Sequence, residues 1–302
     1  MILLLVALAA QHPETTHPEL WAPHRVYDSR HKEYSDFETL AAEASRADVV
    51  FLGEQHDDPG THRMELALLQ SIARRRANVV LALEMFERDA QPILDQYLAG
   101  TVAEDVFLKG SRPWPAYMTD YRPLIEFAKA HAWKVVAGNV PRSLVGMSGV
   151  AGKGLDAITQ RTDSTRPWAA AEFRCPKDDD YFKRFGVSMG QHPMGNGPPP
   201  TAAELASITE RFYLAQCAKD ETMAESIARA RSDASAPLVI HYNGSFHSDF
   251  GQGTAERTKR RLPNAKIVII SAVPVTSFDS VDAKPMRKQG DWLLFTLKAS
   301  AK

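Results

Sequence analysis

Two carboxylates and two imidazoles stand directly after apolar segments of this chain, at the points where buried strands would end. They are Glu54, His56, Glu84 and His247. An acid at the end of an apolar run is costly to desolvate without a partner, so two such acids indicate a built polar site. This mixture of groups suits a divalent transition metal, and it also suits acid–base catalysis without a metal.

A structural role for these four side chains is the alternative to a functional one. Arg63, Arg88 and Arg142 could pair with the acids and tie neighbouring loops together. Because the four residues come from separate segments, no compact motif of the H-E-x-x-H kind identifies a metal site. The segment 149–154 lacks the first glycine and the hydroxyl residue of a phosphate-binding loop, and no G-x-S-x-G hydrolase motif occurs.

The segments that position these residues are short, apolar and rich in β-branched residues. They are 48–53, 79–84, 134–137, 237–242, 266–271 and 292–297. Nearly continuous apolarity predicts strands buried on both faces, as in a mainly parallel β-sheet flanked by helices. Ligands bind beyond the carboxyl ends of such strands, so we expect the four residues in one pocket, with Glu54 and Glu84 at the ends of adjacent strands.

A helix is predicted between the first two strands, at 61–76. Its apolar positions have helical spacing and form one stripe: Met64, Leu68, Leu69 and Ile72. Asp58 and Thr61 suit a helix cap, and Pro59 suits a first helical turn. Strand, helix and strand over this length predict a βαβ unit with a right-handed crossover.

The chain changes character at 141–236, where no clear strand pattern occurs. We predict that this segment is a mostly helical insertion over the carboxyl ends of the strands. It belongs to a single α/β domain that spans 25–298. The fold class predicted from the sequence is therefore α/β, with helices on a mainly parallel sheet.

The insertion contains a long predicted helix that begins after Thr201 and ends near Arg231. Glu204, three residues after Thr201, completes a capping-box pattern. Three polar residues on this helix lie at i, i+3 and i+7: Tyr213, Gln216 and Asp220. This stripe is expected to face the rim of the sheet, and an ordinary solvated stripe is the alternative.

Charge and the N-terminal sequence bear on where the protein acts. A net charge of −1 provides no basic field that would attract nucleic acid or an anionic membrane. The apolar residues 1–10 are too few to span a bilayer, and they match the core of a secretory signal. We therefore expect an exported, periplasmic protein, with no lipobox cysteine after the run. Cys175 and Cys217 would form a disulfide in an exported protein and remain thiols otherwise.

Several blocks of sequence resemble the ChaN-like haem-binding (iron-regulated) family, within the superfamily of the Tiki proteases and erythromycin esterases. The blocks keep the family order between about 25 and 275. The main ones are FLGEQHD at 51–57, LEMF at 83–86, WPAY at 114–117, YRPL at 121–124, AGNVPR at 137–142 and GSFH at 244–247. The order of the blocks makes the resemblance more specific than any one motif.

The resemblance implies a haem-binding protein of bacterial haem or iron uptake, with haem at the interface of a homodimer and a tyrosine oxygen on the iron. The candidate haem-binding residues are Tyr27, Tyr34, Tyr117, Tyr121 and His192. Arg112, Arg122 and Arg142 are candidates for binding the propionates, because guanidinium matches carboxylate geometry. Each tyrosine on its own would also suit a packing role.

The wider superfamily implies a second hypothesis, a metal-dependent or Glu/His acid–base hydrolase. Glu54 or Glu84 would activate water, and His56 and His247 would bind a divalent metal ion or carry protons. All four residues are thus candidates for both catalytic and metal-binding roles. A third hypothesis is a binding protein in which these four polar side chains no longer catalyse a reaction and only stabilise the structure.

Overall fold

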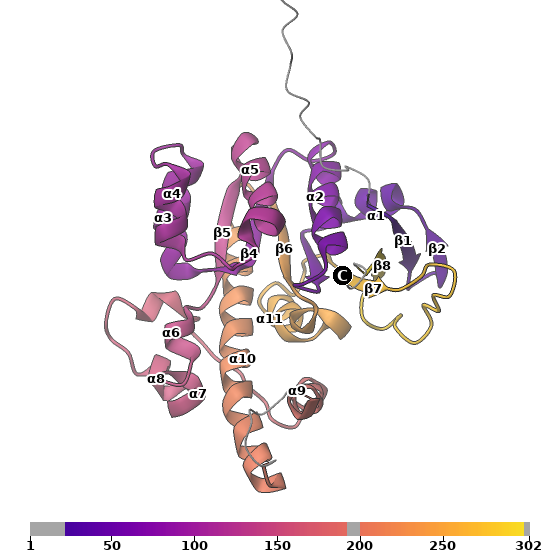
Figure 1. The fold of residues 1–302 in the computed structure, drawn as a ribbon. Helices are drawn as coiled ribbons and strands as arrows, with labels where there is room; N and C mark the ends of the chain where they lie inside the picture. The colour runs from indigo at the N-terminus through magenta and orange to yellow at the C-terminus, as the bar shows by residue number, and fades with distance from the viewer. Residues whose placement is uncertain (1–21, 192–199, 299–302) are drawn as a thin grey trace, which may run out of the picture.

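Eight strands form one sheet in the order β2-β1-β8-β7-β3-β6-β4-β5 (Figure 1). The structure is a computed structural model, and it describes residues 22–191 and 200–298. The strands are β1 (His24–Asp28), β2 (Glu33–Ser35), β3 (Val49–Glu54), β4 (Val79–Glu87), β5 (Lys134–Asn139), β6 (Leu238–Gly244), β7 (Ile267–Val275) and β8 (Trp292–Leu297).

Six strands, from β8 to β5, run parallel, and β1 pairs antiparallel with both β8 and β2. The predicted mainly parallel sheet and its six apolar strands are confirmed. The expectation that Glu54 and Glu84 end adjacent strands is wrong, because β6 lies between β3 and β4. A crossover helix fixes the direction of the next strand but does not fix how many strand positions it skips.

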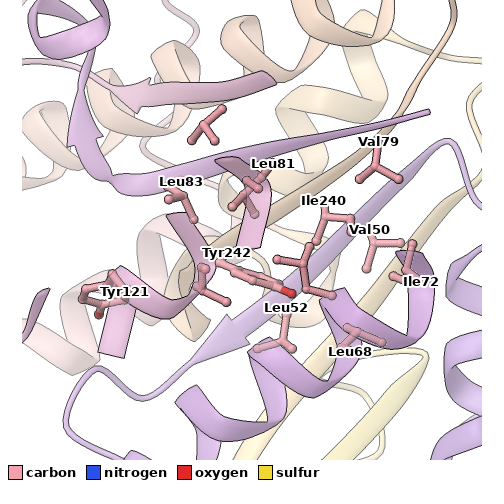
Figure 2. Close-up of a cluster of buried hydrophobic side chains, with 14 of the residues drawn as sticks. Val50, Leu52, Leu68, Ile72, Val79, Leu81, Leu83, Tyr121, Ile240 and Tyr242 are labelled. Atoms are coloured by element: carbon pink, nitrogen blue, oxygen red, sulfur yellow. The ribbon is translucent and has the colours of Figure 1, made fainter. Parts of the chain in front are cut away.

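Both faces of the central strands are buried, and alternate residues pack against different helices. Figure 2 shows the first face, where Val50 and Leu52 lie near Leu68 and Ile72 of α2 (Pro59–Ala73). On the second face, Phe51 packs in a cluster with Ile227 of α10 (Ala202–Arg231). Burial of each large aliphatic side chain stabilises the fold by roughly 1.5–3 kcal/mol, which explains the near-continuous apolarity of these strands.

The alternation along the strands assigns the two glutamates to opposite faces of the sheet. Glu54 follows Leu52 by two residues and therefore lies on the α2 side. Glu84 follows Val80 and Ala82, which pack on the α10 side. The carboxyl edge of the sheet thus carries one buried acid on each face.

The helix predicted at 61–76 is α2, which spans Pro59–Ala73 and begins at the predicted cap. Asp58 caps α2, and its carboxylate accepts a hydrogen bond from the Thr61 amide at 2.8 Å. A π-helical turn at Tyr117–Tyr121 leads into α5. The other helices outside the insertion are α1 (Phe37–Ala44), α3 (Gln91–Leu98), α4 (Glu104–Ser111), α5 (Arg122–Ala130) and α11 (Gly253–Arg261).

The helical insertion is confirmed, and α10 is its longest element at 30 residues. Thr201 and Glu204 form the predicted capping box at its start. In Figure 1, α10 passes across the sheet and extends beyond it, with α9 beside its far part. The remaining helices of the insertion are α6 (Arg142–Val145), α7 (Val150–Lys153), α8 (Asp156–Thr159) and α9 (Asp180–Gln191).

A disulfide joins Cys175, before α9, to Cys217 on α10, with the Cα atoms 5.8 Å apart. This settles the choice between paired and free cysteines that the sequence left open. It ties the irregular segment that precedes α9 to the long helix. None of the described helices combines the length and apolarity that crossing a bilayer requires.

Candidate functional site

The neighbouring strands β3 and β6 end in the same pattern, a glycine followed three residues later by a histidine. The two pairs are Gly53 with His56 and Gly244 with His247. A Cβ on Gly53 would lie 2.8 Å from Ser248 Oγ, and a Cβ on Gly244 would lie 2.7 Å from His56 Nε2. Each glycine therefore leaves room for the histidine loop of the neighbouring strand to pack closely.

Glu54 is the centre of the site on the α2 side and is almost fully buried. Its Oε1 accepts hydrogen bonds from the hydroxyl of Tyr121 at 2.7 Å and from His56 Nδ1 at 2.5 Å. Two residues of α2 complete this half: His62 Nδ1 lies 2.9 Å from Glu65 Oε2. We call Glu54, His62, Glu65 and Tyr121 the α2-side cluster.

The two carboxyl groups of the α2-side cluster are close enough to affect each other. Burial and the nearby charge of Glu54 raise the pKa of Glu65 well above its usual range. Burial would also raise the pKa of Glu54, but hydrogen bonds from His56 and Glu65 and the nearby imidazoles lower it overall. Of the two, Glu54 is therefore the more readily ionised and Glu65 the more readily protonated.

His247 is the centre of the site on the α10 side, where two carboxylates hold it. Its Nδ1 donates to Asp220 Oδ1 at 2.7 Å, and its Nε2 lies 3.2 Å from Glu84 Oε1. Asp220 also accepts from the hydroxyl of Tyr181 at 2.7 Å. We call Glu84, His247, Asp220 and Tyr181 the α10-side cluster.

In the α10-side cluster, two carboxylates surround a protonated imidazole. Burial alone would lower the pKa of His247, but the charges of Glu84 and Asp220 outweigh it and raise the pKa to about 9. The same attraction lowers the pKa of Glu84 and of Asp220 despite their burial. Two carboxylates and one imidazolium leave this half with a net negative charge at neutral pH.

His56 links the two clusters and is the member of the site that solvent reaches. Its side chain is 44% exposed, and its ring lies 4.8 Å from the ring of Trp114. A Cβ on Gly244 would come within 3.7 Å of Glu84 Oε2 as well as touching the His56 ring, so both side chains border this glycine. Burial would lower the pKa of His56, but the hydrogen bond to Glu54 and the charge of Glu84 raise it overall.

A groove of about 600 Å³ opens beside this site, near the ends of β4 and β5. Its walls combine an indole and two prolines with three cationic side chains. Glu87 holds two of the cations, with its carboxylate 2.7 Å from Arg142 Nε and 3.3 Å from an Arg112 nitrogen. The lining residues are Glu87, Arg112, Pro113, Trp114, Pro115, Asn139, Val140, Arg142 and Lys219.

A second cavity, of about 460 Å³, lies on the other side of the loop that carries His56. Gln55 and Asp57 from that loop line it, together with the end of β7 and Lys298. It includes none of the four catalytic candidates. The lining of the groove likewise includes none of the four, but its Trp114 contacts the ring of His56, so of these two cavities the groove borders the exposed member of the site.

The structure places the other predicted haem residues in different parts of the molecule. Tyr27 and Tyr34 pack against each other on β1 and β2, at the opposite edge of the sheet from β5. Tyr117 and Tyr121 belong to the turn that follows Trp114, and both are buried. Arg122 forms an ion pair with Glu104. His192 and residues 1–10 lie outside the described residues.

Four residues of the site were not predicted as site residues, namely His62, Glu65, Asp220 and Tyr181. The polar stripe on the long helix pointed toward one of them, because Tyr213 and Asp220 are fully buried and Gln216 lies 3.4 Å from His247. His62 and Glu65 stand three residues apart beside the apolar stripe of α2. Two polar residues at this helical spacing next to a buried face were the available signal.

Among the described residues, Glu54, His62 and Glu65 form the set of three metal-ligating side chains whose donor atoms lie within 4.8 Å of one another. His56, Glu84 and His247 make the pairings given above. The four-residue metal set expected from the sequence stays a prediction. Arg63, Arg88 and Arg142 do not neutralise Glu54 or Glu84 in any ion pair within the described chain, so histidines supply the partners.

Comparison with known families gives a match over most of the chain. The family model described as "Haem-binding uptake, Tiki superfamily, ChaN" matches residues 40–258. No curated protein matches the sequence.

Comparison with solved structures supports the same architecture. A structure of ChaN from Campylobacter jejuni, titled for cofacial haem binding, has a TM-score of 0.63 at 17% identity, covering 90% of this chain and 96% of that one. The type III effector HopBA1 has a TM-score of 0.45 at 12% identity, covering 93% and 99%. A Bacillus cereus protein has a TM-score of 0.46 at 12% identity, covering 79% and 68%. At 17% identity, the similarity to the Campylobacter jejuni structure supports the α/β fold alone.

Proposed function

Because the chain belongs to the haem-binding uptake family of the Tiki superfamily, that of ChaN, we propose that it binds haem in the groove beside Trp114. The groove volume lies within the roughly 300–1,000 Å³ that small-molecule sites occupy. The observation that carries this proposal is the composition of the groove. An indole and two prolines form an apolar wall, and Arg112, Arg142 and Lys219 surround it with positive charge.

Haem is a flat apolar ring with two carboxylates at one edge, and the groove offers a partner for each part. Trp114, Pro113 and Pro115 would pack against the porphyrin, and most of the affinity would come from that burial. Arg142 is 70% exposed and pairs with Glu87 through Nε, which leaves its terminal nitrogens for a propionate. No salt bridge joins Lys219, which lines the groove, to another described residue, so its ammonium is available as well. Arg112 would add a third contact while it stays paired with Asp89.

In this proposal the iron ligand comes from a segment next to the groove and not from the side chains that line it. The described residues that line the groove include no tyrosine, histidine, cysteine or methionine. We propose Tyr117, Tyr121 and His192 as the candidates within the chain. Tyr117 and Tyr121 belong to the turn after Trp114. Tyr27 and Tyr34 are six or more strand positions from β5, so they would reach this haem only from a second copy in a homodimer.

We propose a role in bacterial haem or iron uptake outside the cytoplasm, in the periplasm or another exported location. Membership of the family supports the uptake role. The disulfide between Cys175 and Cys217 supports the location, because disulfides persist mainly in oxidising compartments.

A titration of the purified protein with ferric haem tests this function. We expect a Soret band with saturation at micromolar haem, together with quenching of tryptophan fluorescence. Arg142→Ala combined with Lys219→Ala should weaken binding about two- to thirtyfold, since each exposed charge pair contributes about 0.2–1 kcal/mol. Trp114→Ala should weaken it by about tenfold or more because it removes buried apolar area.

The matched control is Lys298→Ala, which removes one cation from the second cavity and should leave haem affinity unchanged. Tyr117→Phe, Tyr121→Phe and His192→Ala identify the iron ligand, because loss of the ligand shifts the Soret band. Absence of haem uptake at micromolar concentrations would reject the function. Equal losses in the Lys298 control would reject the groove.

The Asp220–His247–Glu84 arrangement supports a second candidate, a Glu/His acid–base hydrolase. In this candidate Glu54 orients His56 through Nδ1, which leaves Nε2 to exchange protons with a substrate. A divalent metal held by Glu54, His56, Glu84 and His247 is the metal-dependent form of the same hypothesis. Hydrolysis of a chromogenic ester that Glu84→Ala abolishes, in a protein that takes up no haem, would favour this candidate.

A further inference from the structure

We propose that Glu54, His62 and Glu65 bind one divalent first-row transition metal ion, of the Zn²⁺ class, on the α2 side of the sheet. The donor atoms of the three side chains lie within 4.8 Å of one another. The site is separate from the Trp114 groove and does not depend on haem binding. It also differs from the four-residue metal set considered for a hydrolase, with which it shares only Glu54.

The spacing of the donor atoms suits a tetrahedral ion. His62 Nδ1 lies 2.9 Å from Glu65 Oε2 and 3.9 Å from Glu54 Oε2. Bonds of about 2.0–2.1 Å to Zn²⁺ place neighbouring ligand atoms about 3.3 Å apart, between these two values. One histidine and two carboxylates also resemble in type the His₂Glu sets that zinc takes in enzymes.

The hydrogen bonds of His62 direct a lone pair toward the two carboxyl groups. His62 Nε2 faces two acceptors, the His56 carbonyl oxygen at 3.2 Å and Asp120 Oδ2 at 3.5 Å. Nε2 therefore carries a proton, and a metal ion would bind the lone pair of Nδ1, which faces Glu54 and Glu65. A carboxylate and a carbonyl behind the far nitrogen are the usual supports of a metal-binding histidine.

Two carboxyl oxygens in this space have no hydrogen-bond partner other than a proton held between the two carboxyl groups themselves. They are Glu54 Oε2 and Glu65 Oε1, and both residues are at most 1% exposed. With Nδ1 of His62, three buried electron pairs face one another, which is unstable unless positive charge lies between them. The hydroxyl of Tyr121 occupies Glu54 Oε1, so it leaves Oε2 as the free oxygen.

Protons are the competing occupants of this space. One proton shared by Glu54 and Glu65 satisfies both carboxyl groups, but it leaves the lone pair of His62 Nδ1 opposite Glu65 Oε2. A second proton on Nδ1 is then required. One divalent ion satisfies all three donors at once, and its two charges match those of the two carboxylates.

Metal analysis of variants tests the proposal. The full chain is stripped with a chelator, incubated with Zn²⁺, desalted and analysed for zinc by mass spectrometry. We expect one zinc per chain for the unchanged protein. Glu65→Gln and His62→Asn should each lower zinc affinity at least tenfold in a calorimetric titration. Glu65→Gln keeps the shape of a protonated Glu65, so this variant folds with the proton-type pairing intact.

Glu84→Gln and His247→Asn are the matched controls from the α10-side cluster and should retain one zinc per chain. Thermal melts supply a second readout: zinc should raise the melting temperature of the unchanged protein and leave that of Glu65→Gln in place. Two results overturn the proposal. One is zinc that survives in Glu65→Gln but is lost in the controls. The other is an unchanged protein that retains no zinc, which assigns the space to protons.

Discussion

His247 illustrates how two buried charges set the charge of a third. Its pKa of about 9 in the fold exceeds the usual 6.5, so protonation stabilises the folded state. That contribution is complete below pH 6.5 and disappears as the pH rises through 9. The lowered pKa values of Glu84 and Asp220 act in the opposite sense, because their contribution is lost on acidification below about pH 4.

We therefore expect the free energy of unfolding to fall by on the order of 2–3 kcal/mol between pH 6.5 and pH 9.5. Urea denaturation at both pH values measures this loss. His247→Gln should be less stable at pH 6.5 but should show little further loss at pH 9.5. His131→Gln, at an exposed position outside the site, should lose as much as the unchanged protein. A loss that persists in His247→Gln would contradict this assignment.

The sequence predicted the acids of the site better than their partners. Glu54 and Glu84 stand out because a charge at the end of an apolar strand needs a reason. His62 and Glu65 do not stand out, since a polar residue beside an apolar helical stripe normally faces solvent. They are buried because α2 is covered twice, by the sheet and by the turn at Tyr117–Tyr121. The packing of this turn against α2 is a tertiary contact, and the helical periodicity of the sequence does not predict it.

At the level of the elements, the close approach of β6 to the β3 loop depends on one glycine. Gly244→Ala would place its Cβ 2.7 Å from His56 Nε2, and the imidazole would have to leave its contact with Trp114. We expect a loss of about 1–3 kcal/mol in the free energy of unfolding, as for other overpacked sites. Denaturant titrations with tryptophan fluorescence measure it, because Trp114 lies against His56.

Gly190→Ala is the matched control for this substitution. Gly190 lies in α9, and a Cβ there meets no atom within 4 Å. Alanine is the better helix former by about 1 kcal/mol, so this variant should be as stable as the unchanged protein or more stable. Equal destabilisation by both substitutions would show that the space at Gly244 is not what matters.

The strands themselves could be predicted, whereas their order could not. Six of them are buried on both faces, and this produces apolar runs that are visible in the sequence. The short strands β1 and β2 (His24–Asp28 and Glu33–Ser35) carry mostly polar residues at one edge and were not predicted. The position of β6 between β3 and β4 depends on a pairing between distant segments, which local patterns do not encode.

For the whole molecule, the disulfide links the irregular part of the insertion to the helix that holds Asp220. It closes a loop of 42 residues, and cross-links of this kind typically stabilise a protein by about 2–4 kcal/mol. We expect Cys175→Ser combined with Cys217→Ser to lower the melting temperature. The haem spectrum should not change, because neither cysteine lines the groove. An unchanged melting temperature would contradict a structural role for the cross-link.

The position of Glu54 and Glu84 on opposite faces of one sheet has a consequence for how this protein can diverge. The α2-side cluster draws its partners from α2 and the turn before α5, and the α10-side cluster draws its partners from α9 and α10. Substitutions in one set of helices can therefore change the chemistry of one cluster while selection preserves the other cluster. Within residues 22–191 and 200–298, His56 and Gly244 are the two positions described here that serve both halves, so they should tolerate the least variation among descendants of this chain.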